Sequence, residues 1–203
     1  MSEALLVGTA HKPLATDTLM VLIEERTADL DLYADLTAEG DDVEAVTDFV
    51  PGQRPRVRIS ARLTDSARRE HRLRTTLAHE LGHVVLHDFI WWFDQGVLDA
   101  ERARALSPRC HRRPNLRTAD WMEWQAGYMS GALLMPAARI RDELDDAAPV
   151  WVRSARAKRR IERVTATFDV SVEAARVRLQ QLGHVSQRPT SIVRAPLPRW
   201  HAR

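Results

Sequence analysis

The sequence predicts an α+β fold that is mostly helical, with a small β-sheet or hairpin and a C-terminal helix pair. Several segments repeat apolar residues at helical spacing, and one short segment alternates them as a strand does. Of the 203 residues, 44% are hydrophobic, which suffices for a sizeable core in one domain with at most a small appendage. We expect a main domain over residues 1–148, a basic helix pair over 149–184 and a tail over 185–203.

The first predicted elements are a helix and a hairpin. Thr16 or Asp17 is a suitable N-cap, and Glu39-Gly40-Asp41-Asp42 ends the helical pattern. The apolar positions that keep helical spacing between them are Leu19, Leu22, Ile23 and Leu30. Residues 43–50 and 55–60 flank the turn 51–54, and the second run alternates apolar residues with arginines, which indicates a half-exposed strand.

Two longer helices follow the hairpin. The first is predicted over residues 66–87, with Leu73, Leu77, Leu81 and Val84 on its buried side. Residues 88–120 hold three consecutive aromatic residues, two prolines and many arginines, and we interpret them as a partly ordered functional loop. The second helix is predicted over 119–134, because Pro136 disfavours helical backbone at Met135.

The C-terminal pair is predicted over residues 150–168 and 172–182, with Ser171 as an N-cap and Gly183 as a stop. With Arg176 and Arg178 exposed, and further positive charge from 156–160, it resembles a small helix-turn-helix that contacts DNA. We favour the other interpretation, in which both helices pack on the core and the arginines are solvated.

Charge and cysteine content restrict the compartment and the partners. Residues 1–50 carry 2 basic and 12 acidic side chains, whereas residues 149–203 carry 12 basic and 3 acidic ones. Such asymmetry fits either ends that neutralise each other or a polyanionic partner, and we favour the first. A single cysteine excludes an internal disulfide framework, and from the sequence we expect neither a signal peptide nor a membrane span. We therefore expect a cytoplasmic protein.

A metal-binding motif lies within the helix predicted over 66–87. His79-Glu80-Leu81-Gly82-His83 matches H-E-x-x-H. Residues four apart on a helix lie about 40° apart around the axis and ~6 Å along it, so both imidazoles can bind one ion. Glu80 lies on the same side of the helix, where it can take a proton from a zinc-bound water.

A third ligand is needed, and the spacing leaves two candidates. Glu123 lies on the next predicted helix, whose small residues at 126, 127 and 130–132 would allow a close approach. Asp120 lies about one turn earlier and is the rival. His87 is excluded as a ligand together with His79, because the two are ~12 Å apart along a helix. We expect His87 beside the ligands, in contact with the transition state or at the helix end.

The motifs together resemble the ImmA/IrrE family of metallopeptidases. The similarity covers residues 43–140 and rests on the run from Arg74 to His83, the segment Glu123-Trp124-Gln125-Ala126-Gly127-Tyr128 and Ala132-Leu133-Leu134-Met135-Pro136. It implies a zincin-like metallopeptidase fold with His79, His83 and Glu123 as ligands of one Zn²⁺ ion and Glu80 as the catalytic base. Where the family often has Asn or Asp, this chain has Gly127, so a polar contact to a ligand histidine is missing or comes from elsewhere.

The resemblance also implies an activity: a zinc endopeptidase that cuts a helix-turn-helix transcriptional repressor and so controls stress-response or mobile-element genes. The alternative is a non-catalytic zinc module that binds a repressor or DNA. Mn²⁺ and Fe²⁺ fit the same ligands. Tyr128, His87, Arg74 and His111 are candidates for stabilising an oxyanion, and a Cys110 thiolate is a candidate inhibitory ligand.

Overall fold

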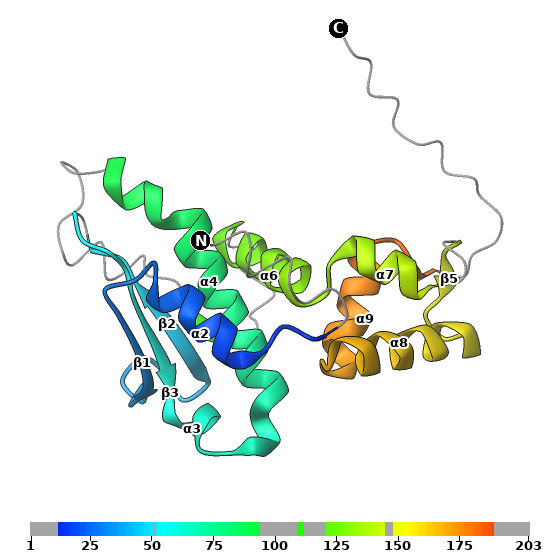
Figure 1. Cartoon of the computed structure of the whole chain (residues 1–203), viewed down its shortest axis with the longest axis horizontal. Helices are drawn as coiled ribbons and strands as arrows, with labels where there is room; N and C mark the ends of the chain where they lie inside the picture. Colours follow the sequence, from blue (N-terminus) through cyan, green and yellow to red (C-terminus); the bar gives the residue numbers. More distant parts are fainter. Residues whose placement is uncertain (1–11, 51, 94–108, 112–120, 145–147, 189–203) are drawn as a thin grey trace, which may run out of the picture.

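The fold is α+β and mostly helical, which confirms the predicted class (Figure 1). The computed structural model describes residues 12–50, 52–93, 109–111, 121–144 and 148–188, with only the backbone described for 88–93 and 109–111. The helical elements are α2 (Thr16–Glu24), α3 (Ala61–Thr64), η1 (Ala67–Arg69), α4 (Glu70–Phe93), α6 (Trp121–Leu134), α7 (Ala137–Glu143), α8 (Ala155–Phe168) and α9 (Val172–Gln181). The strands are β1 (Asp29–Ala34), β2 (Val43–Asp48), β3 (Arg56–Ser60), β4 (Arg109–His111), β5 (Val150–Trp151) and β6 (Val185–Ser186).

The described strands form a four-stranded mixed sheet and a small two-stranded one. In the larger sheet the order is β1-β3-β2-β4. Strands β2 and β3 pair antiparallel, as the hairpin prediction required, and β2 also pairs antiparallel with β4. Strand β1 instead runs parallel to β3. Strand β2 therefore lies inside the sheet, where its side chains can face α4.

One apolar core joins the sheet to the helices. Leu19 and Ile23 of α2, Ile59 of β3 and Leu77 of α4 are all fully buried in it. These positions are the ones that helical and strand spacing predicted. The core fixes α4 against the sheet, and α4 is the helix that carries the H-E-x-x-H motif.

The first predicted helix was wrong in its length. Helix α2 ends at Glu24, and Leu30 lies in β1. Between residues 29 and 34, leucines alternate with aspartates, which suits a strand, and Leu30 pairs with Val57 of β3. The strand partner lies far along the chain, so helical spacing carried over from α2 concealed it.

Helices α4 and α6 lie side by side and approach each other closely at a glycine. A Cβ atom at Gly82 would lie 2.9 Å from Cα of Ala126, a distance too short for two carbon atoms. Gly82 of α4 and Ala126 of α6 therefore permit the close contact that a shared metal ion would need. Helix α6 ends at Leu134, just before Met135-Pro136, as predicted.

The C-terminal helix pair packs against the rest of the chain, and two of its arginines, Arg160 and Arg178, are buried although the arginines of this pair were expected in solvent. Arg178 was expected to be exposed, but it is only 3% exposed, and its Nε donates a 3.1 Å hydrogen bond to the Met135 carbonyl oxygen. Arg176 pairs with Glu173 on the surface of α9. Ser171 caps α9 as predicted, accepting from the Ala174 N–H. The domain boundary at residue 148 stays a prediction.

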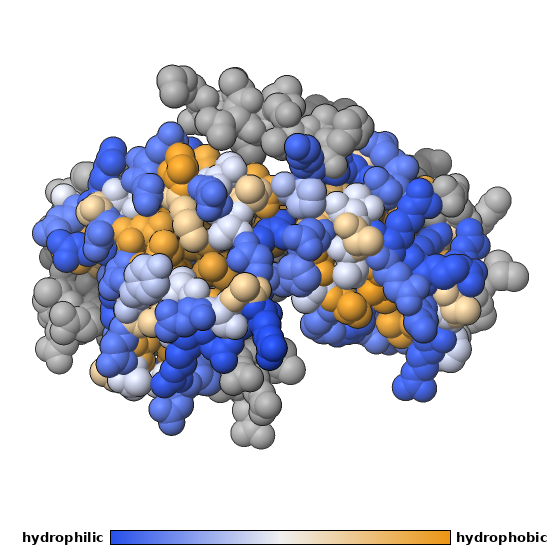
Figure 2. Space-filling model, turned by 60° about the horizontal axis from the view of Figure 1, so that its bottom comes forward, coloured by the Kyte–Doolittle hydropathy of each residue, from blue (hydrophilic) through white to orange (hydrophobic). Residues whose placement is uncertain are grey.

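One face of the molecule is largely hydrophilic. Figure 2 shows polar and charged side chains over most of one face, with hydrophobic ones between them. Among the described residues, no helix combines the length and apolar character required to span a bilayer.

Candidate metal centre

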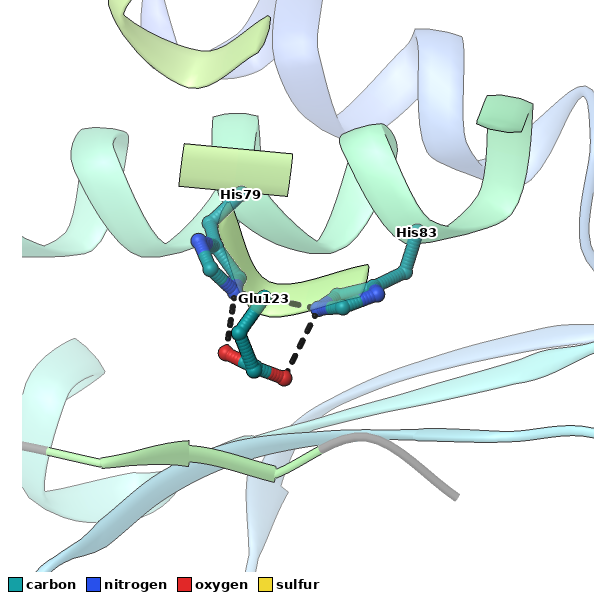
Figure 3. A group of neighbouring side chains, drawn as sticks. All are labelled: His79, His83 and Glu123. Carbon is teal, nitrogen blue, oxygen red and sulfur yellow. Dashed lines mark hydrogen bonds and ion pairs between the residues drawn. The ribbon is translucent and has the colours of Figure 1, made fainter. Parts of the chain in front are cut away.

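Three side chains from two helices converge beside the sheet. His79 and His83 project from successive turns of α4, and Glu123 projects from the first turn of α6 toward them (Figure 3). The two Nε2 atoms are 3.0 Å apart, and the carboxylate oxygens of Glu123 lie 3.1 Å from His79 Nε2 and 3.2 Å from His83 Nε2. The structure thus brings together the three residues that were predicted as ligands.

These distances fit a single small cation. Zinc binds imidazole nitrogen and carboxylate oxygen at ~2.0–2.2 Å, so neighbouring ligand atoms of a tetrahedral site are about 3.3 Å apart. One ligand atom from each of the three residues can be chosen so that all lie within 4.8 Å of one another. The two imidazoles and the carboxylate could therefore hold one ion. Their role as ligands remains a prediction.

The charges of the cluster also favour a cation. Burial opposes ionisation of Glu123, yet its hydrogen bonds with His79 and His83 lower its pKa to about 2. Burial lowers the pKa of His83 to about 4, so this imidazole is neutral near pH 7. Burial also disfavours the charged form of His79, but the hydrogen bond to Glu123 and the charges of Glu80 and Glu123 raise its pKa overall. Glu123 is thus an anion near pH 7, and it lies beside a neutral imidazole of the kind that binds metals.

Glu80 lies beside this cluster and is fully buried. Its Oε2 accepts a 2.5 Å hydrogen bond from the hydroxyl of Thr47 on β2. Among the described residues its Oε1 has no hydrogen-bond partner. Burial raises the pKa of Glu80 to about 7 despite the opposing effects of His79 and Thr47. A carboxyl group with a pKa near neutrality and one free oxygen is suited to accept and return a proton.

A second row of contacts lies behind the cluster. His87, only 2% exposed, places Nδ1 3.0 Å from Nδ1 of His83 and Nε2 3.0 Å from Oε1 of Gln125. His87 therefore lies beside a proposed ligand, which is one of the places expected for it. Gly127 lies beside the other proposed ligand, where a Cβ atom would be 4.0 Å from His79 Nδ1.

Other predicted candidates have structural contacts or lie outside the described residues. Arg74 is buried, and its guanidinium donates to Phe168 and Asp169 at the end of α8. Tyr128 stacks on Trp124, with the Arg178 guanidinium carbon 5.2 Å from its ring centre. Asp120, the rival third ligand, and the side chains of Cys110 and His111 lie outside what is described.

Two polar residues of this region were missed as functional candidates. Strand alternation places Thr47 on the same face of β2 as Ala45, but it does not show that Glu80 lies opposite. Gln125 is two residues from Glu123, and only the position of His87 one turn after His83 hinted at a partner there.

Comparison with known proteins identifies one matching protein family. The model of a peptidase family, M78, described as the IrrE N-terminal-like domain, matches residues 32–180. No curated protein matches the chain. The match includes both metal-motif helices and extends into α9, and it confirms the resemblance that the motifs predicted. Because it spans most of the sequence, the chain belongs to the IrrE N-terminal-like family of M78 peptidases and carries a metallopeptidase-type domain.

Proposed function

We propose that the protein is a zinc-dependent endopeptidase that cuts a helix-turn-helix transcriptional repressor. The observation that carries the proposal is the convergence of His79, His83 and Glu123 beside buried Glu80, whose Oε1 has no hydrogen-bond partner among the residues that the structure describes. A purely structural cluster would not need that fourth group.

The proposed cofactor is one zinc ion held by His79, His83 and Glu123. Two imidazoles and one carboxylate are a catalytic donor set, because three protein ligands leave a coordination position for water or substrate. Mn²⁺ and Fe²⁺ suit the same atoms, so supply and geometry decide among the metals. Zinc bound there would supply Lewis acidity, which polarises a peptide carbonyl and makes a nearby water more acidic.

Glu80 acts as the base in the proposed reaction. Its free Oε1 takes a proton from the attacking water, while Oε2 stays hydrogen-bonded to Thr47. The water oxygen adds to the peptide carbonyl carbon. The C–N bond then breaks, and Glu80 returns its proton to the departing nitrogen. Thr47 holds the carboxylate in position during both transfers.

The proposed substrate class and cellular role come from the family rather than from the geometry. In the ImmA/IrrE family, cleavage of a repressor would release genes for stress response or mobile-element transfer. We propose the same for this chain, which would act in the cytoplasm, where such repressors bind DNA. In the C-terminal region, Arg160 and Arg178 are buried and donate to backbone carbonyls, which leaves them unavailable to DNA.

A Glu80→Gln variant separates an enzyme from a binding module. The zinc-loaded parent and variant are incubated with a proteome-derived peptide library, and new peptide N-termini are identified by mass spectrometry. We expect new termini with the parent only, while both proteins bind one zinc ion. Equal patterns from the two proteins, or none from the parent, would favour the non-catalytic module.

The substrate class is tested separately, with intact repressors. Purified helix-turn-helix repressors encoded beside this gene are incubated with parent and Glu80→Gln protein. Cleavage of a repressor by the parent alone supports the proposal. Cleavage of library peptides without cleavage of any such repressor would retain the peptidase and reject the substrate class.

A further inference from the structure

Three polar side chains, of which the two histidines are buried and Gln125 is half-buried, form a row that leads away from the metal centre. His83 Nδ1 lies 3.0 Å from His87 Nδ1, and His87 Nε2 lies 3.0 Å from Gln125 Oε1. His83 is fully buried and His87 is nearly so. The two histidines lie one turn apart on α4, and Gln125 extends from α6. These three side chains therefore link the same two helices as the proposed ion does.

The hydrogen bonds among these three side chains determine which nitrogen of each imidazole carries the proton. An amide oxygen only accepts, so His87 donates from Nε2 to Gln125. A neutral His87 then has a lone pair on Nδ1, and that nitrogen accepts from Nδ1–H of His83. A neutral His83 protonated on Nδ1 has its lone pair on Nε2. That nitrogen is the one that lies 3.0 Å from His79 Nε2 and 3.2 Å from the Glu123 carboxylate.

We propose that His87 and Gln125 are positioning residues that hold His83 in its metal-binding tautomer. Without an acceptor at Nδ1, a neutral histidine carries its proton on Nε2 for part of the time, and that form cannot bind an ion through Nε2. Partners of this kind fix ring orientation and raise the basicity of ligand histidines in metal sites. The proposal rests on the proposed metal centre but not on peptide cleavage.

His79, the other histidine proposed as a ligand, receives no hydrogen bond at Nδ1 from the nearest residue of α6. Residue 127 of α6 lies beside Nδ1 of His79, but as glycine it offers no side chain. Within the part of the chain that the structure describes, support for the two imidazoles is therefore unequal, and His83 has the stronger support. Loss of the His87 contact should thus weaken metal binding markedly.

Zinc affinity of substituted proteins tests this role. Zinc binding to the metal-free protein is measured by competition with a chromophoric chelator. His87→Leu, which has no acceptor, should weaken binding by roughly 10- to 100-fold. His87→Asn places an amide oxygen near the former Nδ1 and should restore affinity to within a few-fold of the parent. His71→Gln removes an exposed imidazole from the same helix and should leave affinity unchanged. Equal affinities for the parent and His87→Leu would overturn the proposal.

A second measurement needs no substitution. Long-range ¹H–¹⁵N NMR spectra of the metal-free parent report which nitrogen of each imidazole is protonated. We expect His83 protonated on Nδ1 and His87 on Nε2. The reverse order in both rings would overturn the proposal even if the variants fail to fold. If the parent binds no zinc, the proposed function fails instead.

Discussion

The burial of Glu80 makes a quantitative prediction about the metal-free protein. The pKa of this carboxyl group is raised from its ordinary value of 4.5 to about 7, mainly by burial. The difference of about 2.5 pH units corresponds to about 3 kcal/mol. Between pH 4.5 and 7 the unfolded chain has lost this proton while the folded protein keeps it. Rising pH therefore lowers the stability of the folded state across that window, and the loss is complete above pH 7.

The Glu80→Gln variant removes this dependence, because an amide does not ionise and its oxygen can still accept from Thr47. The free energy of unfolding is measured by urea denaturation of metal-free protein at pH 5 and pH 8. The free energy of unfolding of the variant minus that of the parent should rise by about 2 to 3 kcal/mol from pH 5 to pH 8. Shared groups such as Glu123 and His83 affect both proteins and largely cancel in the comparison.

A surface carboxylate provides the control. Glu162 on α8 has a side chain that is 60% exposed, so Glu162→Gln should change stability little at either pH. The reasoning would be refuted if the difference in free energy of unfolding between Glu80→Gln and the parent stayed constant from pH 5 to pH 8. A variant less stable than the parent at pH 8 would refute it as well.

Three further predictions concern residues around the site, and the last of them compares two substitutions. Thr47→Val removes the hydrogen bond to Glu80, so it should lower kcat while zinc affinity, measured by chelator competition, stays unchanged. Gly82→Ala places a methyl group against the backbone of α6, so it should destabilise by about 1–3 kcal/mol in urea denaturation and weaken zinc binding. Arg178→Met loses a buried hydrogen bond to a backbone carbonyl and should cost about 2–4 kcal/mol, whereas Arg176→Met on the surface should cost under ~1 kcal/mol. The first prediction would be contradicted by an unchanged kcat in Thr47→Val, and the second by an undiminished zinc affinity in Gly82→Ala. The third would be contradicted by equal losses of stability in the two arginine variants.

Local periodicity predicted most of the elements near the site. Leu73, Leu77 and Leu81 indicated α4, and all three are buried. The position of both H-E-x-x-H histidines on one side of this helix then follows from helix geometry alone. Convergence with Glu123 was inferred from small residues on α6, and the contact of Gly82 with Ala126 gives the physical reason.

Elements defined by distant partners were harder to predict. Strand β1 pairs in parallel with β3, which the local sequence does not identify as its partner, and helical spacing continued from α2 led to the assignment of Leu30 to a helix. Arg178 was expected in solvent because arginines usually are, but the backbone carbonyl that holds it comes from Met135, beyond the end of α6. The contact of Thr47 with Glu80 also depends on distant residues, since only the packing of α4 on β2 brings the two side chains together.

The central claim is that one ion binds between His79, His83 and Glu123, and a crystal structure of the zinc-loaded protein tests it most directly. Anomalous diffraction recorded at the zinc absorption edge should give a single strong peak within ~2.2 Å of both Nε2 atoms and a Glu123 oxygen. Glu80 should not be a ligand. A peak elsewhere, or a fourth protein side chain bound to the ion, would contradict the account.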